Sequence, residues 1–317
     1  MRSLITILLS SILFSAYAQR QNVYYIKGIS QKVSTRDSAD FIRIVREPDS
    51  GSVLYKLTEY YGNGTQKLLG LSSTIDPIKF EGISTTFDKN GKRRTVLNFK
   101  AGRLLGDQYY YYPNGKLREA RTYLAPGKDF KEIYLINTYN DSTGKALVTA
   151  GNGHYQNQDY QNKTFSEGEL KDGLKQGEWK TSVKNDSIIV NEIYNSGTFV
   201  KGTAKFANGE VVTYDKPETL PQFPGGVDGF GRFLGRTLRY PADAQRNGIQ
   251  GRVMLSFVVE KDGSLTNIHP VGASPSPLLT EEATRVLNES PKWQPGMQYG
   301  RAVRVQYTVP IIFNLGR

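Results

Sequence analysis

The amino-acid sequence predicts an all-β region followed by a smaller α+β domain, in which helices cover one face of a small antiparallel sheet. Between residues 52 and 216, short aromatic segments alternate with Asn-Gly and Asp-Gly pairs, the pattern of successive β-hairpins. From residue 227 onward, helix-like apolar spacing alternates with strand-like alternation. The length of 317 residues fits two or more domains, because single cores seldom grow beyond about 250 residues.

Composition argues against several functional classes. The net charge is +11, but Lys and Arg are interleaved with Asp and Glu and no basic run occurs, so we expect no nucleic-acid partner. The absence of Cys excludes disulfides and thiolate metal sites. With His154 and His269 as the two histidines, neither a catalytic triad nor a multi-histidine zinc site is expected. We therefore expect a binding protein and not an enzyme, with no metal and no cofactor.

The first residues have the pattern of an export signal. Arg2 precedes an apolar run, and Ala16-Tyr17-Ala18 gives a small-x-small cleavage motif before Gln19. As a helix, residues 4–18 would span about 22 Å, short of the roughly 30 Å hydrocarbon core. We expect a signal peptide over residues 1–18, cleavage between Ala18 and Gln19, and a periplasmic mature chain. A retained signal would instead anchor the protein in the inner membrane.

Two regions precede the α+β domain. Residues 19–51 form a polar lead-in with one predicted strand at residues 41–45. Residues 52–216 carry the turn pairs Asn63-Gly64, Asn90-Gly91, Asn114-Gly115, Asp172-Gly173 and Asn208-Gly209. The first three are 27 and 24 residues apart, which suggests a degenerate repeat. With Asn-Gly-Lys turns such as residues 112–116, the region resembles MORN-type repeats of bacterial envelope proteins.

A linker is predicted at residues 217–226, because three prolines and two glycines in ten residues do not favour a regular element. The elements expected after it are listed here in order: a helix at 227–238, a short helix from Tyr240-Pro241 to Gly248, a strand at 253–259, a turn at 261–264, a strand at 265–271, a helix capped by Thr280 with Glu281 and Glu282 in its first turn, and a strand at 303–313.

An ordered set of motifs runs through this domain, from residue 221 to residue 315. They are Pro221-x-Phe223-Pro224-Gly225-Gly226, Tyr240-Pro241-x-x-Ala244, Gly248-x-x-Gly251-x-Val253, Phe257-x-Val259, Asp262-Gly263, Glu282-Ala283-x-Arg285-Val286, Pro291-Lys292-Trp293-x-Pro295-Gly296 and Val303-x-Val305-x-Tyr307-x-x-Pro310-x-x-Phe313. The set resembles the TonB C-terminal domain. In that family position, Trp293 is expected to fill the junction between helix and strand.

The resemblance implies a mechanical coupling module that binds a short extended peptide of an outer-membrane transporter, or another envelope protein, by strand addition. It places the binding edge on the last strand, at Val303, Arg304, Val305, Gln306, Tyr307, Thr308 and Val309. Pro310 agrees with an edge position, because proline has no N–H for a central strand.

One departure from the family lies at the other end of the chain. A typical TonB has a Pro-rich spacer and a transmembrane helix gripped by a proton-driven motor, whereas this chain has repeats and an export signal. An alternative hypothesis therefore stays open, in which the repeats act as an envelope scaffold that binds peptidoglycan, lipid or protein, and the TonB-like domain only docks it. The oligomeric state is left open.

Overall fold

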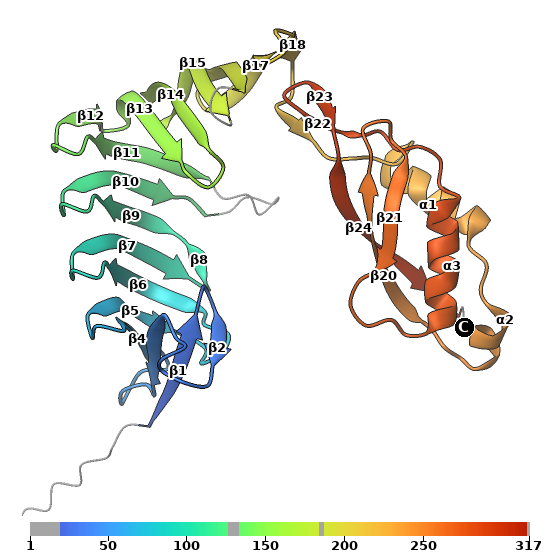
Figure 1. Ribbon diagram of the computed structural model, residues 1–317, viewed down its shortest axis with the longest axis horizontal. Coiled ribbons are helices and arrows are strands. Elements are labelled where there is room, and N and C mark those ends of the chain that lie inside the picture. Colours follow the sequence, from blue (N-terminus) through green and yellow to red (C-terminus); the bar gives the residue numbers. More distant parts are fainter. Residues whose placement is uncertain (1–19, 126–132, 184–186, 316–317) are drawn as a thin grey trace, which may run out of the picture. The chain divides into compact units, whose positions relative to one another are not determined.

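The structure is a computed structural model that describes residues 20–125, 133–183 and 187–315 (Figure 1). It is mostly antiparallel sheet with few helices, which confirms the strand-rich fold predicted from the sequence. Two compact units are present: Met1–His154 with Leu170–Leu174, and Tyr155–Glu169 with Lys175–Arg317. The predicted cleavage site, Ala18 and Gln19, lies outside the described residues. No helix within the described ranges has the length and apolar character to cross a membrane.

The first unit is a run of antiparallel strands. Their bounds are β1 Gln21–Lys27, β2 Gln31–Val33, β3 Phe41–Arg46, β4 Tyr55–Tyr61, β5 Gln66–Ser72, β6 Phe80–Phe87, β7 Arg93–Lys100, β8 Arg103–Leu104, β9 Gly106–Tyr111, β10 Leu117–Tyr123, β11 Tyr134–Asn140 and β12 Ala146–Thr149. The lead-in therefore holds three strands where one was predicted. The strand β1 was missed because Ile26 is its one fully buried residue, although it pairs along its length with β3.

The hairpin turns of this unit are tied together by a recurring pair of contacts. The Tyr61 hydroxyl donates to the Phe87 carbonyl 26 residues later (2.9 Å), and the Asn63 amide donates to the Lys89 carbonyl (3.1 Å). The same two contacts recur from Tyr112 and Asn114, to carbonyls 28 residues further on. The Asn-Gly turns at residues 63–64 and 114–115 are thus each bonded to the turn of the following hairpin.

The next strands are β13 Asn152–Asp159, β14 Thr164–Lys171, β15 Leu174–Val183, β16 Ile188–Asn195, β17 Thr198–Phe206 and β18 Val211–Tyr214. The last four form an antiparallel run in sequence order. Their core contains the buried carboxylate of Glu192, which accepts hydrogen bonds from the hydroxyls of Tyr194 (2.8 Å) and Tyr214 (2.9 Å). These bonds satisfy a group that would be costly to bury alone.

The C-terminal part contains three helices and two small sheets (Figure 1). The bounds are β19 Glu218–Thr219, α1 Gly226–Thr237, α2 Ala242–Arg246, β20 Gly251–Val259, β21 Leu265–Pro270, α3 Pro277–Asn288, β22 Gly296–Gln298, β23 Arg301–Val303 and β24 Val305–Phe313. One sheet has the order β19-β22-β23 and the other β21-β20-β24. The helices and the buried alternate residues of β20 and β24 share one core, so an α+β arrangement follows the β region.

Two expectations for this part were wrong. The predicted linker contains the strand β19, and its residue Gln222 exchanges two backbone hydrogen bonds with Gln294 (3.0 and 2.8 Å). This pairing is possible because the prolines of the segment lie at other positions and leave the N–H of Gln222 available. The third helix begins at Pro277, three residues before Thr280. Its N-cap is Ser276, whose hydroxyl accepts from the Leu278 N–H (3.2 Å), with Pro277 following at the first helical position. Serine before proline is the stronger start signal.

Candidate functional site

The strand β24 lies at the edge of its sheet. It pairs with β20 over its whole length, from Val305 opposite Val259 to Phe313 opposite Gly251, without a register shift. In the part of the chain that the structure describes, no strand pairs with its other side. A strand in this position presents a row of backbone donors and acceptors to a partner.

The register decides which residues of β24 present these groups. The Met254 carbonyl accepts a hydrogen bond from the Val271 N–H (2.9 Å), on the β21 side of β20. Because the N–H and C=O of a strand residue point to the same side, Met254 directs both groups away from β24. Pro310, which faces Met254, must therefore direct its backbone away from β20, toward the open edge.

Alternation extends this result along the strand. Gln306, Thr308 and Ile312 share the outward direction with Pro310, so each presents an N–H and a carbonyl at the edge. Pro310 presents only a carbonyl. The intervening residues, including Tyr307 and Val309, use their backbone groups in the β20 ladder. The edge therefore carries two consecutive outward donors, at Gln306 and Thr308, before the interruption at Pro310.

The structure places the residues of the predicted edge in different elements. Val305, Gln306, Tyr307, Thr308 and Val309 lie in β24. Val303 ends β23 and pairs with Gly296 in the other sheet, and Arg304 lies between the two strands. The unbroken strand expected at residues 303–313 was thus wrong, since Val303 pairs with β22 and not with β20, and Arg304 interrupts the strand.

Arg304, just before the start of β24, forms an ion pair through its side chain. Its guanidinium donates two hydrogen bonds to the Glu260 carboxylate, at 2.6 and 2.8 Å. These bonds lower the pKa of Glu260 below its ordinary value. The Gln306 amide donates to the Ser256 hydroxyl (3.0 Å) across the strands. The side chains of Arg304 and Gln306 are therefore engaged inside the domain, while the outward backbone groups of Gln306 are not part of the β20 ladder.

An apolar groove of roughly 570 Å³ runs beside this edge. Its walls come from residues 220–223, from one side of α1 and from residues 307–310 of β24, with Trp293 also in the lining. Its lining contains no charged side chain. Leu220 and Val227 line it while 66% and 89% exposed. The groove and the open edge thus share Thr308 and Pro310.

Trp293 supports the groove from the core side. The indole ring is 5% exposed and lies with its centroid 5.5 Å from Phe223, 5.7 Å from Phe230, 5.3 Å from Phe257 and 5.8 Å from Tyr307. The indole N–H donates to the Ser290 hydroxyl (2.9 Å), as a buried Trp requires. The ring therefore contacts the segment at residue 223, the helix α1 and the strands β20 and β24.

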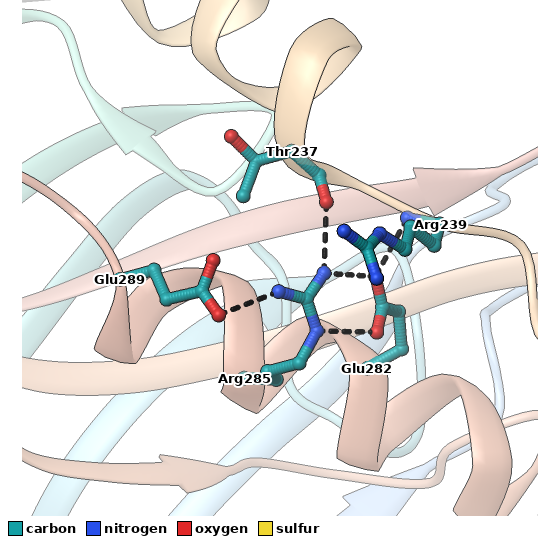
Figure 2. A network of polar contacts seen from close by, with 5 residues as sticks. All are labelled: Thr237, Arg239, Glu282, Arg285 and Glu289. Carbon is teal, nitrogen blue, oxygen red and sulfur yellow. Dashed lines mark hydrogen bonds and ion pairs between the residues drawn. The ribbon is translucent and has the colours of Figure 1, made fainter.

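A polar network fixes the other end of α1 (Figure 2). The Arg285 guanidinium, on α3, donates to the carbonyl of Thr237, the last residue of α1 (2.8 Å), and pairs with Glu282 and Glu289. The Glu282 carboxylate also accepts from the Arg239 backbone N–H (2.6 Å). The bonds from Arg285 and Arg239 lower the pKa of Glu282. A cation at a helix C-terminus satisfies its last carbonyls, so this network positions one wall of the groove.

Sequence reasoning missed this groove. The spacing of Val227 with Phe230 and Leu234 predicted one core-facing side of a helix, but Val227 is almost fully exposed. A sequence signal for the groove lay in the Pro-x-Phe-Pro-Gly-Gly segment that directly precedes α1, because Phe223 of this segment packs under the helix. The two histidines do not contribute: in the described residues no cluster of His, Asp or Glu suitable for a metal occurs, and His269 Nδ1 lies 2.8 Å from the Asn267 carbonyl.

Comparison with known proteins identifies the domain that carries this edge. Residues 236–315 match the family model described as Gram-negative bacterial TonB protein C-terminal. The chain carries a TonB C-terminal domain. Over 89 residues it is 34% identical to the Protein TonB of Pseudomonas putida, which covers 27% of this chain and 36% of that protein. The chain thus spans about a third of the length of this curated relative.

A solved structure is also similar to the TonB C-terminal domain of this chain. It is the NMR solution structure of the Helicobacter pylori TonB C-terminal domain, with 26% sequence identity, covering 28% of this chain and 91% of that chain. The TM-score of 0.23 carries no structural argument. The family model begins at residue 236, so the groove residues contributed by the 220–223 segment and most of α1 lie before the matched region.

Proposed function

We propose that this protein is a TonB-like adaptor of the periplasm that captures an extended peptide of an outer-membrane transporter, or of another envelope protein, by strand addition to β24. The observation that carries the proposal is the direction of the β24 backbone. Its outward N–H and carbonyl groups at Gln306 and Thr308 form the pattern that an added strand requires.

Strand addition is a binding reaction that requires backbone hydrogen bonds and no catalytic side chain. A peptide aligned with β24 would become the fourth strand of the β21-β20-β24 sheet, beside β24, with its backbone bonded to that of residues 306–308. Affinity then comes mainly from main-chain hydrogen bonds, and selectivity from side chains on alternate faces. This chemistry is binding without turnover, and the domain's similarity to Protein TonB supports it.

The β region before the domain supports a second element of the proposal. We propose that it consists of MORN-type repeats, because the Tyr and Asn contacts between successive turns recur at separations of 26 and 28 residues. Such repeats would carry the binding domain within the envelope. The alternative scaffold function, with peptidoglycan as a candidate ligand, would use this region directly.

The test of strand addition is a proline at an outward position. In Thr308→Pro the lost N–H points away from β20, so the sheet should persist while the peptide loses a donor. In Tyr307→Pro the lost N–H belongs to the β20 ladder, so the domain should unfold. The matched control Thr308→Ala keeps the backbone donor and should bind normally.

Binding would be followed by calorimetry with TonB-box-like peptides of outer-membrane transporters, and folding by circular dichroism. We expect Thr308→Pro to remain folded and to lose peptide binding. A folded Thr308→Pro protein that binds these peptides as tightly as the wild type would show that β24 is not the binding edge.

A further inference from the structure

We infer that the partner of β24 carries two aliphatic side chains at alternate positions, i and i+2, and that both enter the apolar groove beside the edge. This inference rests on the proposed strand addition and specifies the chemistry of the peptide. The residue between the two aliphatic positions is polar, because it faces the exposed side of the sheet.

The geometry of cross-strand pairs leads to this pattern. Residues opposite each other on neighbouring strands project to the same face of a sheet. Tyr307 and Val309 project to the helix-covered face, where Val309 is 7% exposed and part of the core. Peptide residues opposite them would project to that face too, and at that point the space is the groove, which Tyr307 and Val309 both line. Gln306 and Thr308 project to the exposed face.

The groove lining selects aliphatic side chains. It contains no charged group, and its apolar residues Leu220 and Val227 are 66% and 89% exposed, unlike the buried residues of the domain core. Covering such surface with an apolar side chain is favourable, because it removes apolar area from water. A charged side chain in the same place would lose its water without gaining a partner.

A second copy of this chain does not fit the same site. Its β24 could approach the edge, but the Val309 side chain of that copy is held in its own core. The side chains of such a strand that would face the groove are already packed in its own core, so the occupant is a peptide without its own packed face. An extended segment of another protein meets this condition.

One residue provides a direct way to close the groove. Gly231 lies on α1 in the groove lining, and a Cβ placed there meets nothing within 4 Å. A leucine at this position fits the helix without strain and occupies the groove. Gly235, one turn later, is equally open but does not line the groove, so Gly235→Leu is the matched control. Both changes improve helix propensity by similar amounts.

The experiment measures binding of two synthetic nine-residue peptides to the full mature chain by calorimetry. One alternates valine with threonine and the other contains threonine alone, so that both favour strands but only one has aliphatic anchors. We expect the valine-containing peptide to bind at least about tenfold more tightly, the effect of burying one aliphatic side chain. In Gly231→Leu this advantage should disappear, and in Gly235→Leu it should persist.

The outcomes separate this inference from the function on which it rests. Equal affinity for the two peptides, or an advantage that survives in Gly231→Leu, overturns the groove inference and leaves strand addition intact. Failure of both peptides to bind overturns the two together. Sedimentation of the chain alone gives the last comparison: a dimer that Gly231→Leu dissociates, and Gly235→Leu does not, would show that the groove holds a second copy.

Discussion

The backbone N–H of Trp293 donates a hydrogen bond of 2.8 Å to the carbonyl oxygen of Gly263. The two backbones are also packed closely, since a Cβ added to Gly263 would lie only 2.0 Å from the Trp293 carbonyl oxygen. The turn between β20 and β21 is therefore bonded to the backbone of Trp293, the residue whose indole ring lies beneath the groove. The stability of the hairpin and the position of the ring depend on each other.

Gly263→Ala should destabilise the C-terminal domain by at least about 2 kcal/mol, because it adds a backbone clash to a left-handed conformation at φ = +83°. Gly248→Ala is the matched control, since φ is +64° and a Cβ there meets nothing within 4 Å. That variant should lose only about 1 kcal/mol. Urea unfolding followed by Trp293 fluorescence, in a Trp179→Phe background, checks both. Equal losses would contradict the clash.

Trp293→Ala should lower the free energy of unfolding by about 3–5 kcal/mol, because it leaves a large cavity among the surrounding rings. Trp293→Phe retains much of this packing and should cost less. Thermal unfolding by circular dichroism measures the order of the three proteins. If Trp293→Ala melts like the wild type and only loses peptide binding, the ring is a surface anchor and not a core residue.

Glu282 should make the domain sensitive to acid. Its pKa lies below the ordinary 4.5 in the folded chain, owing to the bonds from Arg285 and Arg239. A carboxyl of this kind stabilises the fold above its unfolded pKa, and the contribution is lost as pH falls through the folded pKa. Glu282→Gln should therefore cost about 1 kcal/mol at pH 7, and the difference from wild type should close below pH 4.5.

The control for this prediction is Glu289→Gln. Glu289 is the other partner of Arg285, but its side chain is 53% exposed, so its removal should cost only about 0.3 kcal/mol at pH 7. Unfolding free energies would be measured from pH 3 to pH 7 for the three proteins. A Glu282→Gln difference that stays constant over this range would show that the carboxylate is not the titrating group.

The N-terminus of the mature protein provides the last prediction. Mass spectrometry of the periplasmic fraction should find a chain that begins at Gln19, because the apolar run is short and Ala16-Tyr17-Ala18 has the cleavage pattern. An Ala18→Arg variant should block processing. An intact Met1 chain recovered from the inner membrane would contradict the prediction and restore an anchor that a motor could hold.

Local periodicity predicted much of the C-terminal fold. The alternation of Val309, Ile311 and Phe313 assigned the buried face of β24 correctly, since a side-chain period of two needs no knowledge of neighbours. The direction of the backbone groups could not be obtained this way. It depends on the pairing of Met254 with Pro310 and on the bond from Val271, which join residues far apart in the chain.

The groove was missed for a similar reason. Helical spacing treats Val227 and Phe230 alike, although one is exposed and the other packs on the core. The difference arises because Phe223, from the segment predicted as a linker, lies 5.3 Å from Phe230 and occupies the space beneath α1. The binding edge itself followed from the family resemblance, and its use by a partner stays a prediction.

Pro310 has a consequence for the behaviour of the protein at high concentration. An uninterrupted edge could recruit another copy, which would expose a fresh edge and let the association propagate into a fibre. Pro310 removes the N–H donor between Thr308 and Ile312. A long strand therefore could not form an uninterrupted ladder of hydrogen bonds with this edge, whereas a short peptide could pair with the part before Pro310. One imino acid would thus oppose the edge-to-edge association of copies of this chain.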